Sequence, residues 1–325
     1  MNDAVERHVP VMLDRCVELL RHALDSPGAI AVDATLGLGG HAEAILASSP
    51  GTRLVGIDRD GDAIRLASER LAAFGSRFAA HRGEYDDIAG ALSAWGATRA
   101  DAILFDLGVS SMQIDETQRG FSYAADAPLD MRMSRDDART AADIVRDENE
   151  SALATMFAEY GEERYAPRIA RAIVRRRAIT PITRTGDLVE IVRAAIPAAA
   201  RAKGGNPAKR TFQALRIAVN DELGILARAI PAAIEATSVG GRIVVLSYHS
   251  LEDRLVKRAF AAGAEDQTPR LLPQTREDDR PYLRLLTRGA EKASEAEAER
   301  NPRSASVRLR AVERIRETPP SRRAA

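Results

Sequence analysis

The sequence predicts an α/β fold of the Rossmann-like kind, with a mostly parallel sheet and a helical insertion. Two observations support this prediction. Short apolar segments rich in β-branched residues alternate with helical segments over residues 1–106. Residues 107–210 then show helical periodicity and no convincing strand, after which the alternation resumes. The insertion is therefore expected between the fourth and fifth strands.

The elements before the insertion follow one another closely. An opening helix is expected at 13–24, followed by a first strand at 30–33. The next elements are a strand at 53–58, a helix at 61–74, a strand at 78–82 and a strand at 100–106. Because a helical crossover joins successive strands, these strands should pair in parallel.

The insertion and the remaining strands complete the prediction. Four helical stretches are expected, at 141–145, 151–160, 167–177 and 185–195. One long helix follows, because apolar residues recur at spacings of three and four from Phe212 to Ile230. Later strands are expected at 242–247, 282–286 and 306–310, and the Ala- and Glu-rich stretch 291–300 as a solvated helix or mobile connector. We expect a sheet domain of 1–112 and 211–325 and an inserted substrate-recognition domain of 113–210.

Composition limits the class of protein. The chain has 325 residues, 45% of them hydrophobic, and 47 basic residues balance 47 acidic ones, so net charge indicates no polyanionic partner. Cys16 is the sole cysteine, which excludes an internal disulfide and is typical of a reducing cytoplasm; we expect it in the core. No signal peptide or membrane span is expected. The five histidines have no ligand spacing, so no metal site is expected.

A glycine-rich turn after the first strand indicates a nucleoside-cofactor site. The strand ends at Asp33, and Gly37, Gly39 and Gly40 let the backbone turn tightly before a helix begins. Asp58 closes the next strand about twenty residues further on, where an acid can accept hydrogen bonds from a ribose diol.

Two cofactors fit this turn. Gly37-x-Gly39-x-x-Ala42 also satisfies the relaxed fingerprint of nicotinamide enzymes. However, Asp33 would repel a pyrophosphate at the helix N-terminus and attract the ammonium group of S-adenosylmethionine. The turn therefore favours S-adenosylmethionine and leaves a nicotinamide-dependent oxidoreductase as an alternative.

The fourth strand ends at Asp106, at the edge of the sheet where a transferable methyl group would lie. An exocyclic amine is a poor nucleophile, so a carboxylate that holds its N–H and takes the proton would help. Many amino-methyltransferases follow this acid with two prolines and an aromatic residue, which are missing here. Asp106 capping a loop is the structural alternative. A buried Cys16 offers no nucleophile for ring-carbon methylation, so amine or oxygen acceptors remain.

The insertion carries candidate RNA contacts. Phe121 and Tyr123 can stack on a base turned out of its helix, with Asp130 and Arg132 reading its edge; alternatively both aromatics pack the insertion onto the sheet. Between 164 and 216, thirteen basic residues face two acidic ones, which indicates phosphate contacts or a solvated helix face.

His249 follows the fifth strand, at the functional edge of the sheet. It is a candidate for RNA contact or proton relay, with a structural role as the alternative. Ser250 with Asp253 resembles a capping box, so much of this segment is also explained by the start of a helix.

Ten short strings, in order along nearly the whole chain, carry a family resemblance. They are His8-Val9-Pro10-Val11, Asp33-Ala-Thr35-x-Gly37-x-Gly39-Gly40-His41, Asp58-Arg59-Asp60, Asp106-Leu-Gly-Val-Ser-Ser, Arg119-Gly-Phe-Ser, Pro128-Leu-Asp-Met-Arg-Met, Tyr160-Gly-Glu-Glu-Arg164, Arg210-Thr-Phe-Gln-Ala, His249-Ser-Leu-Glu-Asp-Arg and Asn301-Pro-Arg303. Together they resemble the MraW/RsmH methyltransferases.

This resemblance implies a class I methyltransferase with a seven-stranded sheet. Such an enzyme uses S-adenosylmethionine to methylate the exocyclic amine of one cytidine in the decoding region of bacterial small-subunit ribosomal RNA. The implied partner is that RNA within the small subunit, with no DNA or membrane partner, and the location is cytoplasmic.

The resemblance also implies the cofactor contacts. They fall on Gly39, Gly40, His41, Asp58, Tyr85, Asp106 and Gln113. Tyr85 stands where the family usually has phenylalanine, so the aromatic face is kept and the added hydroxyl needs a partner. An assembly factor that binds cofactor and RNA without turnover is a second alternative to the enzyme.

Overall fold

The computed structural model describes residues 10–201, 206–268 and 276–322. The chain divides into two compact units. The first, here called the sheet unit, comprises 1–108 and 224–325, and the second, the helical unit, comprises 109–223. His8, in the first string of the family resemblance, lies outside the described residues.

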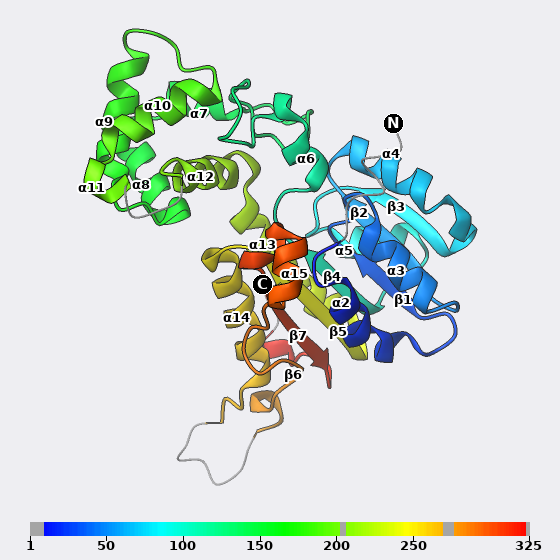
Figure 1. The fold of residues 1–325 in the computed structure, drawn as a ribbon. Coiled ribbons are helices and arrows are strands. Elements are labelled where there is room, and N and C mark those ends of the chain that lie inside the picture. Colours follow the sequence, from blue (N-terminus) through cyan, green and yellow to red (C-terminus); the bar gives the residue numbers. More distant parts are fainter. Residues whose placement is uncertain (1–9, 202–205, 269–275, 323–325) are drawn as a thin grey trace. The chain divides into compact units, whose positions relative to one another are not determined.

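The sheet unit is built on seven strands in the order β3-β2-β1-β4-β5-β7-β6 (Figure 1). The strands are β1 (Ile30–Asp33), β2 (Arg53–Asp58), β3 (Phe78–Arg82), β4 (Ala100–Asp106), β5 (Thr237–Ser247), β6 (Leu283–Leu285) and β7 (Arg308–Arg314). Strands β1 to β5 pair in parallel, whereas β7 runs antiparallel to both β5 and β6. The predicted α/β class with a mostly parallel seven-stranded sheet is confirmed.

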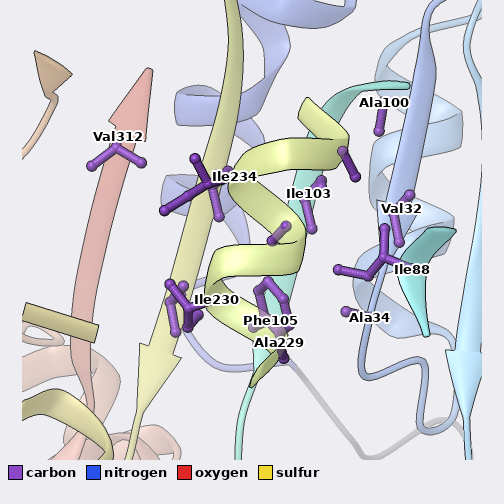
Figure 2. Packing of buried hydrophobic residues seen from close by; sticks show 14 of the residues in the cluster. Val32, Ala34, Ile88, Ala100, Ile103, Phe105, Ala229, Ile230, Ile234 and Val312 are labelled. Atoms are coloured by element: carbon purple, nitrogen blue, oxygen red, sulfur yellow. The ribbon is translucent and has the colours of Figure 1, made fainter. Parts of the chain in front are cut away.

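Helices cover both faces of this sheet. They are α2 (Leu13–Arg21), α3 (Gly40–Ser48), α4 (Gly61–Arg70), α5 (Ile88–Ala94), α13 (Glu222–Ala236), α14 (Ser250–Ala264) and α15 (Glu295–Arg300). Side chains alternate along β4: Ile103 and Phe105 join the core that contains Ile230 and Ile234 of α13, as Figure 2 shows. Ala102 and Leu104 join the opposite core, with α2, α3 and α4. Both faces of the sheet are therefore buried, as a parallel sheet requires.

The helical unit has a core of its own. Its helices are α6 (Ser111–Asp115), α7 (Ala141–Asp147), α8 (Glu150–Gly161), α9 (Ala166–Arg177), α10 (Thr185–Ala195), α11 (Ala198–Arg201) and α12 (Lys209–Asn220). Apolar residues of α8, α9, α10 and α12 meet in one buried cluster that includes Phe157, Ile169, Leu188 and Leu215. Among its described residues, extended pairing is limited to an isolated bridge between Pro128 and Arg184.

The single long helix predicted after the insertion is wrong. Helix α12 ends at Asn220, Asp221 adopts the left-handed conformation with φ 48°, and α13 begins at Glu222. Phe212 and Leu215 of α12 pack in the helical unit, so that unit extends to Leu223 instead of ending near 210. Apolar periodicity continues across a one-residue break, which is why the sequence reads as one helix.

Several other predicted boundaries shift. The opening helix ends at Arg21 and the helix after β2 at Arg70, each followed by a 3₁₀ turn, at His22–Leu24 and Ala72–Arg77. Strand β5 begins at Thr237, before the Gly240-Gly241 pair: Thr237 pairs with Ala100 of β4, and the register then shifts so that Arg242 pairs with Ala102. Strand β7 starts and ends later than predicted.

The stretch 291–300 contains the predicted solvated helix, α15, none of whose residues is buried, and it is not a free connector. A Glu297 carboxylate oxygen, Oε1, accepts a hydrogen bond from the Met12 backbone N–H at 2.6 Å. The Arg15 guanidinium donates to both carboxylate oxygens of Glu291, at 2.8 and 2.9 Å. These contacts attach the segment to α2.

Cys16 is 0% exposed and lies in the core, as predicted. Among the helices of the described residues, none is both long enough and apolar enough to cross a membrane.

Candidate active site

The glycine turn between β1 and α3 has the conformation that its sequence predicts. Gly37 has φ +50° and Gly39, the residue before α3, has φ +77°, a region that disfavours side chains. A Cβ at Gly40 would lie 2.5 Å from Cγ of Pro10. Glycine at Gly39 therefore meets a conformational requirement, and glycine at Gly40 meets a packing requirement.

Asp33 lies beneath this turn. It is 1% exposed, and its Oδ1 accepts a hydrogen bond from the Thr35 backbone N–H at 3.2 Å. Burial raises the pKa of Asp33 to about 6, with the neighbouring His41 opposing that effect. A direct contact with an ammonium group requires the turn to move, so Asp33 as a cofactor ligand stays a prediction.

Asp58 ends β2 beside the same turn. Its Oδ2 accepts from the Gly37 N–H at 2.8 Å and its Oδ1 from the Asp60 N–H at 2.9 Å. Desolvation raises the pKa of Asp58 to about 6 in spite of these two bonds. Each carboxylate oxygen has a second lone pair, so the group keeps capacity to accept from a diol.

Asp106 ends β4 and is the centre of a polar cluster. Its backbone N–H donates to Oγ1 of Thr35 at 2.6 Å, which fixes the strand end against the glycine turn. Its side chain is 24% exposed. The Tyr248 hydroxyl donates to Oδ1 at 2.6 Å, and Nδ1 of His41 lies 3.6 Å from Oδ2. Burial raises the pKa of Asp106, while His41 and Tyr248 act in the opposite direction.

His41 is held inside the sheet unit. Its side chain is 7% exposed, and Nε2 lies 3.1 Å from the Val11 carbonyl oxygen. The ring therefore bridges the segment before α2 and the Asp106 carboxylate.

Tyr248 is the residue that the sequence analysis missed. It follows β5 directly, and its ring lies 3.5 Å from the position a Cβ on Gly108 would take. Burial raises the pKa of its hydroxyl well above the ordinary value. The available signal was an aromatic residue directly after the strand that neighbours β4, because adjacent parallel strands end at one edge.

Tyr85 packs on the sheet below this edge. Its ring meets that of Phe105 edge to face, with centroids 6.0 Å apart and planes at 88°. The residue is half-buried, so part of its aromatic surface is available to a ligand.

The predicted capping box at Ser250 and Asp253 is wrong by one residue. His249 is the N-cap of α14: its Nδ1 accepts from the Glu252 N–H at 3.4 Å, and Glu252 in turn accepts from the His249 N–H at 3.2 Å. Asp253 instead binds Arg308 and Arg310 of β7, at 2.9 and 2.7 Å. The structure thus gives His249 a structural role, and its roles in RNA contact and proton relay stay predictions.

The other candidate residues lie in the helical unit, where each has local partners. Gln113 shares a capping box with Ser110 and donates from Nε2 to the Met133 carbonyl at 3.3 Å. Tyr123 packs edge to face on Phe212, with centroids 5.9 Å apart, and Phe121 lies against the same core. Both aromatics thus pack within the insertion itself.

Asp130 and Arg132 form a bidentate ion pair with two distances of 2.8 Å. This pair must open before either side chain reads a base. Roles for Gln113, Phe121, Tyr123, Asp130 and Arg132 in ligand binding stay predictions.

The basic stretch 164–216 is partly neutralised in the structure. Arg184 pairs with Asp126, Arg216 with Glu222, and Arg171 with Glu150. Arg168, Arg171 and Arg175 are all exposed on α9. Their spacings of three and four place them on one face of the helix. Within the described part of the chain, no acidic side chain pairs with Arg168 or Arg175.

The sheet unit offers groups that suit S-adenosylmethionine. Asp106 could supply negative charge for its cationic groups, Asp58 could accept from its ribose, and Tyr85 could present an aromatic face to its base; these roles stay predictions. A turn shaped by Gly39 and Gly40 allows close approach of backbone. The residues present therefore fit this cofactor.

Comparisons with known proteins show what this chain is similar to. The profile described as the MraW methylase family matches residues 5–315. A protein of Beutenbergia cavernae called ribosomal RNA small subunit methyltransferase H is 57% identical over 316 residues, 97% of this chain and 95% of its own. The protein of the same name from Thermobifida fusca is 60% identical over 310 residues, 95% and 94% of the two chains. Among solved structures, an rRNA methylase from Streptococcus thermophilus aligns with a TM-score of 0.42 and 11% identity, covering 94% of each chain.

Proposed function

Since this chain belongs to the MraW methylase family, we propose that it transfers a methyl group from S-adenosylmethionine to small-subunit ribosomal RNA. The observation that carries the proposal is the match of the family profile over residues 5–315, which includes every strand end at the candidate site. The choice of small-subunit ribosomal RNA as substrate follows the name of the two relatives, ribosomal RNA small subunit methyltransferase H.

The sheet unit is the proposed cofactor site. Backbone of Gly39 and Gly40 and the side chains of Asp58 and Tyr85 would hold the nucleoside, and Asp33 and Asp106 would face its positive charge. The bound cofactor supplies an electrophilic methyl group. A role for Gln113 belongs to the same proposal, although its amide also caps α6.

The proposed acceptor is the exocyclic N4 amine of a cytidine. The Asp106 carboxylate supports an amine acceptor, because it can accept an N–H hydrogen bond and then the proton. Cys16 supports the same choice, because a side chain that is 0% exposed within a core cannot attack a ring carbon. The decoding-region cytidine, the assembled small subunit as substrate and a cytoplasmic location rest on the family resemblance.

The proposed RNA contact surface is the arginine face of α9, formed by Arg168, Arg171 and Arg175. Exposed guanidinium groups on one helix face can each contact a phosphate. Arg168 and Arg175 carry the argument, because Arg171 already pairs with Glu150 at 3.3 Å.

Two experiments test the proposal. Calorimetric titration should show binding of S-adenosylhomocysteine and none of NADH; the reverse would restore the nicotinamide alternative. Methyl-labelled cofactor should then label small-subunit RNA from cells that lack the modification. Asp106→Ala should abolish labelling, whereas an assembly factor without turnover would show no labelling in the unaltered protein either.

A further inference from the structure

Asp106 has two side-chain neighbours, His41 and Tyr248, that a contact between Asp106 and the cofactor does not require. The three side chains come from the start of α3, the end of β4 and the residue after β5. Each oxygen of the Asp106 carboxylate faces a different partner: Oδ1 accepts from Tyr248, and Oδ2 faces His41. The carboxylate is therefore oriented from both sides.

The protonation of His41 follows from its other contact. Nε2 lies 3.1 Å from the Val11 carbonyl oxygen, which can only accept, so Nε2 carries a hydrogen. In a neutral imidazole Nδ1 is then an acceptor, and it faces Oδ2 of Asp106 across 3.6 Å. Two lone pairs facing each other repel. The repulsion ends when a donor lies between them or when one proton joins the pair.

The side chain of Asp106 is more exposed than that of His41. Asp106 is 24% exposed and His41 is 7% exposed. A ligand can therefore reach the carboxylate, while the imidazole behind it is shielded. Tyr248 is not the proton acceptor, because a neutral phenol hydroxyl is a very weak base; it donates its hydrogen to Asp106.

We propose that Asp106 and His41 together take the proton that the substrate amine loses on methylation, and that Tyr248 is a positioning residue for Asp106. This inference rests on the proposed function. The amine nitrogen bonds to the methyl carbon, the bond from that carbon to sulfur breaks with its electron pair on sulfur, and one N–H proton passes to Asp106. His41 shares that proton through Nδ1, and the pair returns it to solvent after product leaves.

The surroundings favour uptake of one proton. The titratable groups whose charges influence this cluster are Asp33, Glu252, Cys16 and Tyr248. Burial and the nearby Glu252 disfavour negative charge on Asp106 and raise its pKa, although His41 and the Tyr248 hydrogen bond act in the opposite direction. A proton acceptor works best when its pKa lies near the working pH, which an isolated carboxylate does not reach.

The test is the pH dependence of single-turnover methyl transfer at saturating cofactor and RNA. The variants are His41→Gln and Tyr248→Phe. The matched control is His81→Gln, because His81 also pairs with an aspartate, Asp87, at 3.0 Å. His41→Gln should lower the plateau rate about 10²-fold and move the acid limb of the profile to lower pH. Tyr248→Phe should lower the rate about tenfold with an unchanged KM for RNA. The control, His81→Gln, should have the same plateau rate and pH profile as the unaltered protein.

A second readout does not need turnover. Nitrogen-15 spectra of histidine in the S-adenosylhomocysteine complex should show His41 with hydrogen on Nε2 and a lone pair on Nδ1. Hydrogen on Nδ1 alone would overturn the inference. An unchanged pH profile in the His41→Gln variant would also overturn it. The same holds if the rate loss of this variant is explained wholly by weaker binding of S-adenosylhomocysteine. Absence of methyl transfer by the unaltered protein would instead overturn the proposed function.

Discussion

Replacing Asp33 by asparagine should stabilise the cofactor-free sheet unit at neutral pH. Asp33 is 1% exposed and its pKa is raised to about 6 from 3.8, so ionising it in the folded state is unfavourable. A shift of about 2 pKa units corresponds to about 3 kcal/mol. Asparagine keeps an oxygen that can accept from the Thr35 N–H and carries no charge, so the Asp33→Asn protein avoids that cost.

The sign follows from proton linkage. Between about pH 4 and pH 6 the folded state binds more protons at Asp33 than the unfolded state does. The contribution of Asp33 to the free energy of unfolding therefore falls as pH rises through this window and is constant above it. The free energy of unfolding of Asp33→Asn should equal that of the unaltered protein near pH 4. At pH 7.5 it should be higher by up to about 3 kcal/mol.

Urea unfolding followed by tryptophan fluorescence measures this difference. Trp95 is the sole tryptophan and packs against the core of the sheet unit, so its signal reports that unit. Asp14→Asn, at an exposed position on α2, is the control and should leave the pH dependence unchanged. If Asp33→Asn is no more stable than the unaltered protein at pH 7.5, the reasoning about the buried charge is refuted.

Three further predictions concern other parts of the chain. Asn220→Ala should lower the free energy of unfolding by about 2 kcal/mol, because Asn220 accepts from the Met133 N–H and donates to the Met131 and Arg216 carbonyls. An unchanged urea midpoint, followed by circular dichroism, would contradict this. Arg168→Glu with Arg175→Glu should weaken RNA binding and reduce its salt slope by about 1.5, measured by fluorescence anisotropy, whereas Arg65→Glu in the sheet unit should not. Tyr85→Phe should keep S-adenosylhomocysteine affinity within about twofold while Tyr85→Ala loses about tenfold by calorimetry, since the ring supplies the contact; equal affinities would remove Tyr85 from the site.

Much of the fold could be predicted because the central strands β1, β2 and β4 of the parallel sheet are buried on both faces. A short apolar segment with β-branched residues, such as Arg53–Asp58, is then interpreted as a buried strand. The break at Asp221 could not be predicted in the same way. Its left-handed φ interrupts two helices whose apolar spacing continues through it, and the residue type alone does not specify that conformation.

The sequence was sufficient to place Asp33, Asp58 and Asp106 at the ends of three strands, where the structure has them. The contact between Asp106 and Tyr248 was not predicted, because the two residues lie at the ends of different strands. Tyr248, the residue after β5, donates a hydrogen bond to Asp106. Pairing of β4 with β5 places the two strand ends together, and no local pattern encodes that pairing. The capping role of His249 was missed because histidine is an uncommon N-cap.

Nucleoside analysis by mass spectrometry, after the protein has reacted with methyl-labelled S-adenosylmethionine and unmodified small ribosomal subunits, tests the central claim most directly. The account predicts label in N4-methylcytidine, at one cytidine of the small-subunit RNA. Label on a ring carbon, on a ribose or on no nucleoside at all would contradict it.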